Sequence, residues 1–391
     1  SLVYPIQNLA HAAGVGFGVG INAMVARRLG EGKTRMANQT ASQGVFLSAL
    51  HGMILTILGM AVIPYFLRMF TSDEVTISYG LTYFCNVFLF STIDTMGMAY
   101  EKVYQSVGKM KISMAAVLIG CVVNIVLDPI FIFGLGPMPE LGIRGAAWAT
   151  GIGQTASLLF YLILNHVKPL NVEISLREMR PSKEICGGMY SVGIAATLNM
   201  ALTSLLLTAL NAILAPFSQV YILVLGVYYK LQALLYQGAS GVVQGMRPLI
   251  GYNFGAREMK RVKKIFRLTL ESSCVIMLFG TVICLLASGQ LMGLFTTTPE
   301  TIAAGSRALK IISAGFLVSA VSVTTSGAME GLGKGTQSLV ISLFRYVVVI
   351  MPTAYLLSHF MGPDGVWNAF WITEVFTAIV SVMIYHKTLK K

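Results

Sequence analysis

Charged residues are scarce in this chain of 391 residues. They make up 11% of the sequence, whereas soluble domains carry about 25%. Hydrophobic residues make up 55%, and the mean hydropathy is +0.73. We therefore expect an all-α integral membrane protein that lies almost wholly within the bilayer.

Several chemical motifs are also missing. Gly30–Thr34 ends like a P-loop, but Arg27 stands where that motif needs its first glycine. We therefore expect no ATP site. The five cysteines show no CxxC spacing, so we interpret them as packing residues and expect no metal site and no cofactor. A membrane-embedded transferase would need paired acids for a metal-bound diphosphate, such as a DxxxD run. The sequence contains no such run, so we do not expect an enzyme.

Apolar segments follow one another along the chain, and each is long enough to cross a bilayer. There are eleven: Leu2–Ala26, Ala41–Phe70, Thr76–Val103, Ile112–Leu135, Gly145–His166, Ile185–Ala215, Gln219–Ile250, Ile265–Phe295, Thr301–Met329, Thr336–His359 and Val366–Tyr385.

Basic residues concentrate in every second loop. These loops are residues 27–35, 102–111, 168–183, 257–267 and 334, and the C-terminal residues 387–391 belong to the same set. The positive-inside rule places this set in the cytoplasm, together with the C-terminus. The net charge of +12 therefore reflects membrane topology, and we expect no nucleic-acid partner.

The sequence contains an internal repeat. At an offset of 225, Phe70 matches Phe295, and after a two-residue deletion Gly142 matches Gly365. Such a repeat of six helices is typical of secondary transporters whose halves are parallel.

The repeat predicts two six-helix lobes related by a pseudo-two-fold axis along the membrane normal. The N-lobe would be residues 1–167, a cytoplasmic linker 168–184, and the C-lobe 185–391. The second half begins with a helix that has no counterpart in the first. We therefore expect 11 transmembrane helices here, with the first helix of 12 missing.

One acid lies deep in an apolar segment. Asp128 is well inside Ile112–Leu135, where a carboxylate costs about 2.5–3.5 kcal/mol on insertion scales and is commonly functional. Asn124 is one helical turn earlier on the same face, and Pro129 follows. We expect Asp128 to bind a coupling ion, H⁺ or Na⁺. The alternative is a structural hydrogen-bonding role.

Other polar residues also fall inside apolar segments. We assign six of them to the wall of a substrate cavity: Tyr4, Gln7, Asp94, Asn199, Tyr229 and Gln232. For the two glutamines, which are equivalent in the repeat, the alternative is interhelical hydrogen bonding. We expect Glu101 and Glu330 to be solvated or paired, and Arg345 to snorkel or pair with an acid. Glu374 fits either a functional or a structural role.

The segment Asn124–Gly134, followed by Gly142–Thr150, resembles the multidrug and toxic compound extrusion (MATE) transporters. Ala26–Gly32 is similar to the end of their second helix. Glu101–Gly108 and Trp367–Glu374 are similar to the MepA-like bacterial branch of the family. The resemblance covers the whole chain.

The resemblance implies a secondary active multidrug efflux antiporter that exports organic, often cationic compounds in exchange for H⁺ or Na⁺ by alternating access. It implies an N-lobe ion site at Asp128, Asn124 and Thr150, completed by an aspartate on the missing first helix. The segment Thr301–Met329, which corresponds to the tenth family helix, has no mid-membrane acid. A C-lobe carboxylate site of the kind seen in one branch is therefore not expected.

We accordingly expect a monomeric, multi-pass protein of the bacterial inner membrane, with small organic cations and lipid as its partners. Two alternatives stay open. A flippase for lipid-linked oligosaccharides, from the same superfamily, would predict fourteen helices and a strongly basic central cavity. The membrane-embedded transferase is the alternative of a different class.

Overall fold

The computed structural model describes residues 3–136 and 138–389, apart from the side chains of Tyr4 and Pro5. All regular secondary structure in this part is helical, as the sequence predicts. Contacts divide the chain into two compact units, Ser1–Thr197 and Leu198–Lys391, and the division falls inside a helix, α7. The predicted linker, residues 168–184, lies within the first unit.

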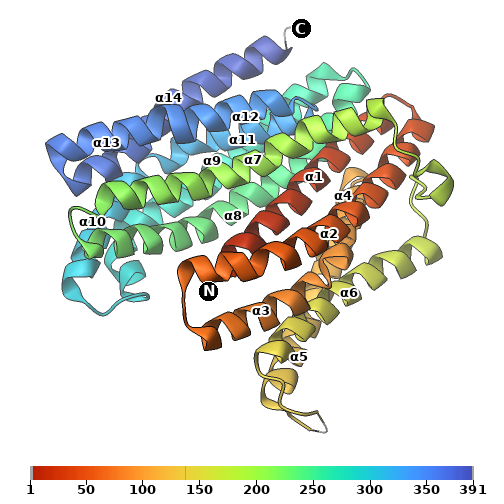
Figure 1. Ribbon diagram of the computed structural model, residues 1–391. Coiled ribbons are helices and arrows are strands. Elements are labelled where there is room, and N and C mark those ends of the chain that lie inside the picture. Colours follow the sequence, from red (N-terminus) through yellow and green to blue (C-terminus); the bar gives the residue numbers. More distant parts are fainter. Residues whose placement is uncertain (1–2, 137, 390–391) are drawn as a thin grey trace. The chain divides into compact units, whose positions relative to one another are not determined.

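The described part of the first unit is a bundle of long helices with short connections (Figure 1). They are α1 (Tyr4–Gly30), α2 (Thr34–Phe70), α3 (Glu74–Phe88), α4 (Ser91–Ser106), α5 (Met110–Phe133), α6 (Ile143–Val167), the 3₁₀ turn η1 (Leu176–Glu178) and the first half of α7 (Lys183–Leu214).

The second unit continues from the second half of α7. Its helices are α8 (Gln219–Gly255), α9 (Met259–Gly293), α10 (Pro299–Ser313), α11 (Phe316–Gly331), α12 (Gly335–Leu343), the π-helix η2 (Phe344–Val349), α13 (Ile350–Met361) and α14 (Pro363–Leu389).

Local chemistry accounts for several helix ends. Asp73 caps α3 by accepting hydrogen bonds from the backbone N–H groups of Val75 and Thr76, at 3.3 and 3.1 Å. Ser218 caps α8 by accepting from a backbone N–H at 3.2 Å. Gly134 ends α5 in the left-handed conformation, with φ at 67°.

Helix ends recur at the offset that the sequence predicts. Helices α1 and α8 end at Gly30 and Gly255, and α5 and α12 begin at Met110 and Gly335. Each pair is 225 residues apart. The repeat is therefore confirmed in the helix boundaries.

The third and ninth predicted segments are broken in the structure, a feature that the sequence does not predict. The breaks separate α3 from α4 and α10 from α11, and the second pair is bent by 57°. At the breaks, Phe90 N–H donates to Val87 O at 3.1 Å and Gly315 N–H donates to Ile312 O at 3.0 Å. These i to i+3 bonds tighten the backbone. Proline, which commonly signals a break, is absent from both places.

Among the described residues, eight helices are long and apolar enough to cross a membrane, or nine if the bent α10–α11 pair is one span. The two further predicted segments, the α3–α4 pair and α8, are helical but less apolar. Helix α4 carries Asp94, Glu101 and Lys102, and α8 carries Lys230 and Arg247. Multiple apolar helices make this a multi-pass membrane protein.

Each unit has its own apolar interior. Tyr104 and Tyr161 are buried in the core of the first unit, and Tyr228 and Trp367 in that of the second. Many large apolar side chains are exposed instead, such as Phe360 at 84%. A soluble protein would bury them, whereas in a bilayer they contact lipid.

The basic ends of α1 and α2 hold the predicted linker in the first unit. Arg28 bridges Glu31 and Glu184, at 3.0 and 2.7 Å. Ser42 Oγ accepts from the backbone N–H of Ser175, and Gln43 Oε1 accepts from that of Ser182, each at 3.0 Å. Loops that the charge pattern assigns to one membrane face therefore gather at one end of this unit.

The last helix of each half is in a different register from the sequence alignment, which pairs Gly142 with Gly365. In the structure Gly142 and Gly362 both have a positive φ, 53° and 61°, just before α6 and α14. Gly145 and Gly365 are then equivalent, because each lets its helix approach the preceding helix closely. A Cβ on either would lie 2.4 or 2.1 Å from a carbonyl oxygen of the preceding helix. The structural pairs are therefore Gly142 with Gly362 and Gly145 with Gly365.

Candidate functional site

Helices α5 and α6 approach each other through two glycines. A Cβ on Gly153 would lie 2.6 Å from the carbonyl oxygen of Gly120, and a Cβ on Gly120 would lie 3.0 Å from that of Gly153. Since real side chains need more space, this crossing depends on glycine at both positions. The crossing brings the neighbouring turns of the two helices side by side.

The three predicted ion-site residues come together next to this crossing. Asn124 Nδ2 lies 3.5 Å from Asp128 Oδ1 and 3.5 Å from Thr150 Oγ1, which is the outer limit of a hydrogen bond. The Thr150 hydroxyl donates to the carbonyl oxygen of Ala146 at 3.0 Å, so its oxygen is available as an acceptor. Asp128 is half-buried. The group offers a carboxylate, an amide and a hydroxyl, which together suit a proton or a hard cation.

A cavity of about 150 Å³ adjoins this group inside the first unit. Its polar lining consists of Gln7, His11, Ser91, Asp94, Thr95, Thr150 and Gln154. Thr150 belongs both to the lining and to the Asn124 group, so the two are continuous. The volume corresponds to roughly five water molecules and is smaller than a typical drug pocket. It suits water, an ion or one part of a larger compound.

Among the described residues, Asp94 is the only acid in the cavity lining and His11 is the only base. Asp94 lies in the first turn of α4, where the break after α3 starts a new helix. Glu101, two turns further along α4, is within electrostatic range of both residues. A cationic group in the cavity would therefore be attracted to Asp94, since Lys102 compensates the charge of Glu101.

Glu101 is held in a compact polar network. Lys102 Nζ lies 2.8 Å from Glu101 Oε1 and 3.1 Å from Gln105 Oε1, and Gln105 Nε2 donates to Glu101 Oε1 at 2.7 Å. Lys102 is buried, with 6% of its surface exposed. The expected pairing of Glu101 is thus confirmed, with its chain neighbour as the partner.

Asn199 lies in a buried network of the second unit. Its Nδ2 donates to Glu330 Oε1 at 3.2 Å and to Ser338 Oγ at 3.0 Å. Glu330 also pairs with Arg247, with 2.7 Å between Nη2 and Oε2. The expected pairing of Glu330 is confirmed, and its partner is an arginine of α8.

The remaining predicted cavity residues are not among the lining residues of the first unit's cavity or lie outside the described residues. The Tyr229 hydroxyl is buried without a hydrogen-bond partner among the described residues, and Gln232 is half-buried. Both belong to α8 of the second unit. The side chain of Tyr4 lies outside the described residues. Their assignment to a substrate cavity stays a prediction.

Sequence reasoning missed four polar residues of the cavity: His11, Ser91, Thr95 and Gln154. Two of them, His11 and Gln154, follow from helical spacing. A signal for His11 was available, since it follows Gln7 by four residues and therefore shares its helix face. Gln154 likewise follows Thr150 by four residues on α6. Helical spacing from a residue already assigned would have identified both.

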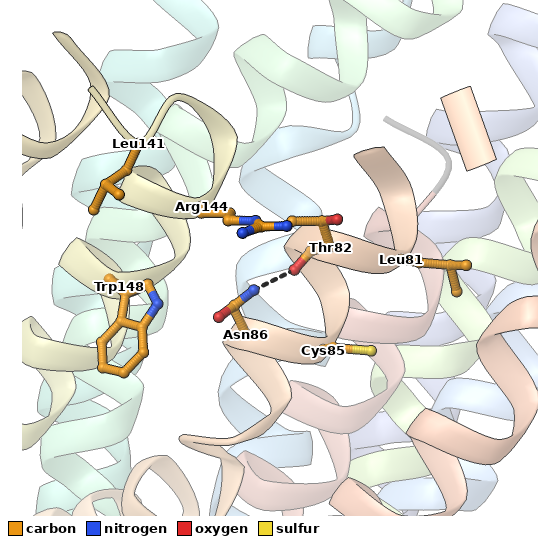
Figure 2. A pocket seen from close by; sticks show the side chains of 7 residues that line it. All are labelled: Leu81, Thr82, Cys85, Asn86, Leu141, Arg144 and Trp148. Atoms are coloured by element: carbon orange, nitrogen blue, oxygen red, sulfur yellow. Dashed lines mark hydrogen bonds between the residues drawn. The ribbon is translucent and has the colours of Figure 1, made fainter. Parts of the chain in front are cut away.

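A second, more open pocket of about 510 Å³ lies between α3 and α6. Figure 2 shows Arg144 of α6 reaching across it toward Thr82 of α3, beside Asn86 and Trp148. Asn86 Nδ2 donates to the carbonyl oxygen of Thr82 at 2.6 Å. Arg144 is the only charged residue in the described part of the lining. This pocket is electropositive, in contrast to the cavity that contains Asp94.

Comparisons with known proteins bear on what these sites do. The model of the MatE family matches residues 1–130 and 195–356. The multidrug export protein MepA of Staphylococcus haemolyticus is 25% identical over 386 residues, which cover 99% of this chain and 84% of that protein. MepA of Staphylococcus aureus is 24% identical over the same length and coverage.

Solved structures are similar to this protein over the full length of the chain. An outward-facing multidrug resistance MATE family transporter of the MOP superfamily has a TM-score of 0.93 and 25% identity, and the match covers 100% of this chain and 88% of that one. A MATE protein in complex with MaL6 also has a TM-score of 0.93, with 24% identity and coverage of 100% and 87%. The latter likeness shows the fold alone.

Proposed function

Because the chain belongs to the MatE family, we propose that it is a secondary multidrug exporter that moves organic, often cationic compounds out of the cell in exchange for H⁺ or Na⁺. The protein is a transporter rather than an enzyme. Two relatives are named as multidrug export proteins, and this supports drugs as the substrate class.

The observation that carries the proposal is the continuity between a carboxylate cavity and an intramembrane acid. The cavity contains Asp94 and includes Thr150 in its lining, and Thr150 lies beside Asn124, which contacts Asp128. A cation in the cavity and an ion at Asp128 would both depend on Thr150, which lines the cavity and lies beside Asn124. Such sharing makes occupancy of one site dependent on the other, which exchange requires.

Asp128 is the residue we propose as the ion-coupling group, with Asn124 and Thr150 as its neighbours. One charge moved through a potential of 100 mV is worth about 2.3 kcal/mol. An exchange that moves one net charge per cycle could therefore support a roughly fifty-fold substrate gradient.

The direct test is efflux of ethidium from cells that express the protein or its Asp128→Asn variant. We expect the variant to lose most efflux while it is inserted in the membrane at normal levels. Glu140→Gln is the matched control, because Glu140 is an exposed carboxylate in the loop after α5. Wild-type efflux from the Asp128→Asn variant would contradict the assignment.

We propose that the protein lies in the bacterial inner membrane as a monomer, with the C-terminus in the cytoplasm. The clustering of basic loops at one end of the first unit supports this orientation. A fluorescent reporter that folds only in the cytoplasm, fused after Lys391, tests the orientation. Light scattering of the purified protein in detergent tests the oligomeric state.

A further inference from the structure

The second unit contains a buried ion pair that the proposed exchange does not use. Arg345 pairs with Glu374, and their side chains are 11% and 9% exposed. Ser322 Oγ also donates to Glu374 Oε2, at 3.4 Å. The surroundings are the apolar core that includes Trp367 and Phe370. Removing two charges from water is costly, and such a pair is seldom the most stable choice for a core. In a membrane, a retained intramembrane acid indicates function.

The structural register shows what this pair replaces. Arg345 corresponds to Gly120 at the offset of 225, and Glu374 and Gln154 both follow the paired glycines Gly362 and Gly142 by twelve residues. In the first unit this region is the tight glycine crossing of α5 and α6. The second unit has an ion pair there instead, so the two halves differ in chemistry at one equivalent place.

The arginine lies on a backbone segment that has an alternative hydrogen-bonding pattern. Arg345 is the second residue of the π-helix η2, and the N–H of Ile350 bonds to its carbonyl oxygen, five residues back. Short π-helical segments are uncommon and frequently occur at functional sites. A change from π to α pairing would rotate the Arg345 side chain about the helix axis, away from Glu374.

Two hydroxyls near the ion pair have no hydrogen-bond partner among the described residues. They are the buried hydroxyls of Tyr229 and Thr377. Thr377 is nearly one helical turn beyond Glu374, on the same face. The Thr377 hydroxyl is available to a carboxyl group that has lost its arginine, and the Tyr229 hydroxyl, which lies beside Arg345, is available to the arginine.

Only one of the described groups that face Glu374 from neighbouring elements carries a fixed charge. Arg345 comes from η2, and Tyr228 and Tyr236 come from α8. Tyr346 of η2 and Tyr229 of α8 lie beside Arg345. Helix α11 contributes the hydroxyl of Ser322. Arg307 of α10 pairs with Asp364 at the start of α14 instead. Arg345 is thus the only cation seen to compensate Glu374 in the described part of the chain.

We propose that Glu374 is a proton-binding site of the second unit, at which a proton and Arg345 compete. A proton from water adds to a carboxylate oxygen of Glu374, and the salt bridge opens. Arg345 keeps its own proton, so the net charge of the pair changes from zero to +1. The unpaired arginine then favours a state in which η2 has moved it toward water. The inference rests on the proposed antiport function and adds a second ion-responsive group to it.

Infrared titration of the purified protein tests proton binding without any transport. On acidification we expect the wild type to develop the carbonyl band of a protonated carboxyl group, and we expect this component to be missing in Glu374→Gln. Glu374→Asp keeps the carboxylate and should keep the band at a shifted frequency. A titrating band that is the same in wild type and Glu374→Gln would overturn the proposal. Failure of the proposed export function would leave this measurement intact.

Transport in liposomes tests the coupling. Arg345→Met with Glu374→Gln removes both charges at nearly constant volume, and we expect substrate binding to persist while transport driven by a pH gradient falls at least tenfold. The matched control is Arg267→Met with Glu271→Gln, which neutralises an exposed Arg–Glu pair with side chains 80% and 54% exposed. We expect wild-type transport from this control. A wild-type rate and pH profile in the Arg345/Glu374 double variant would show that the pair is only structural. If that variant does not fold, the shifted band in Glu374→Asp decides the question.

Discussion

Gly153→Ala is the smallest change that tests whether the α5–α6 crossing positions the ion site. A new Cβ would lie 2.6 Å from the carbonyl oxygen of Gly120, whereas unstrained carbon–oxygen contacts are about 3.3–3.6 Å. The helices would have to separate by roughly 0.7 Å or more. Asn124 Nδ2 and Thr150 Oγ1 are already 3.5 Å apart, so they would end about 4.2 Å apart, beyond hydrogen-bonding distance.

The expected effect on stability is about 1–3 kcal/mol of destabilisation, typical of overpacking. The expected effect on function is larger, because the contact between Asn124 and Thr150 would be lost along with part of the orientation of Asp128. We expect ion-driven transport to fall at least tenfold. Drug binding should change less, since Asp94 lies on α4 and does not move with the crossing.

The assay is transport in proteoliposomes, together with thermal unfolding of the same preparations. Gly97→Ala on α4 is the matched control, because a Cβ there meets nothing within 4 Å. We expect wild-type transport from the control. If Gly153→Ala acts by displacing Asn124, then adding Asn124→Ala to it should cost little more, since neighbouring sites are not additive. Wild-type transport by Gly153→Ala, or full additivity of the two changes, would refute the reasoning.

Two further predictions concern charged groups of the first unit. Glu101→Gln leaves Lys102 buried without its carboxylate and should destabilise the protein by about 3–5 kcal/mol, whereas adding Lys102→Met should restore much of the loss. Thermal unfolding checks both, and an equal loss in single and double variants would contradict the pairing. Partial burial alone would raise the pKa of Glu31, but hydrogen bonds from Lys33 and Arg28 hold it below its usual range. A lowered folded-state pKa means stability that is fully present above the unfolded-state pKa and is lost as pH falls through the folded-state value. Glu31→Gln should therefore lower the unfolding temperature at neutral pH and have no effect in acid, and an equal effect at both pH values would contradict this.

Much of the fold follows from the sequence because it depends on patterns that repeat. The offset of 225 fixes helix ends such as Gly30 and Gly255, and apolar length fixes the number of segments. The breaks before Ser91 and Phe316 were not predicted, because no proline marks them and the apolar run continues through them. The π-helix at Phe344–Val349 was not predicted for a similar reason, since its sequence reads as an ordinary apolar helix.

Part of the candidate site could also be predicted from the sequence. The i, i+4 spacing of Asn124 and Asp128 is local, so helix geometry alone places them together. The position of Thr150 came from the family resemblance, because contacts between helices depend on how α5 and α6 cross. The partners of Glu330 and Glu374 could not be predicted, because no local rule indicates which of several distant arginines will pair with a buried acid.

The measurement that tests the central claim most directly is uptake of a labelled organic cation into proteoliposomes under an imposed H⁺ or Na⁺ gradient, with wild type and Asp128→Asn compared side by side. Our account predicts accumulation in the wild type that requires the gradient and disappears when it is collapsed. It predicts that Asp128→Asn still binds the cation but does not accumulate it. Accumulation by Asp128→Asn at the wild-type level, or accumulation by the wild type that is independent of both gradients, would contradict the account.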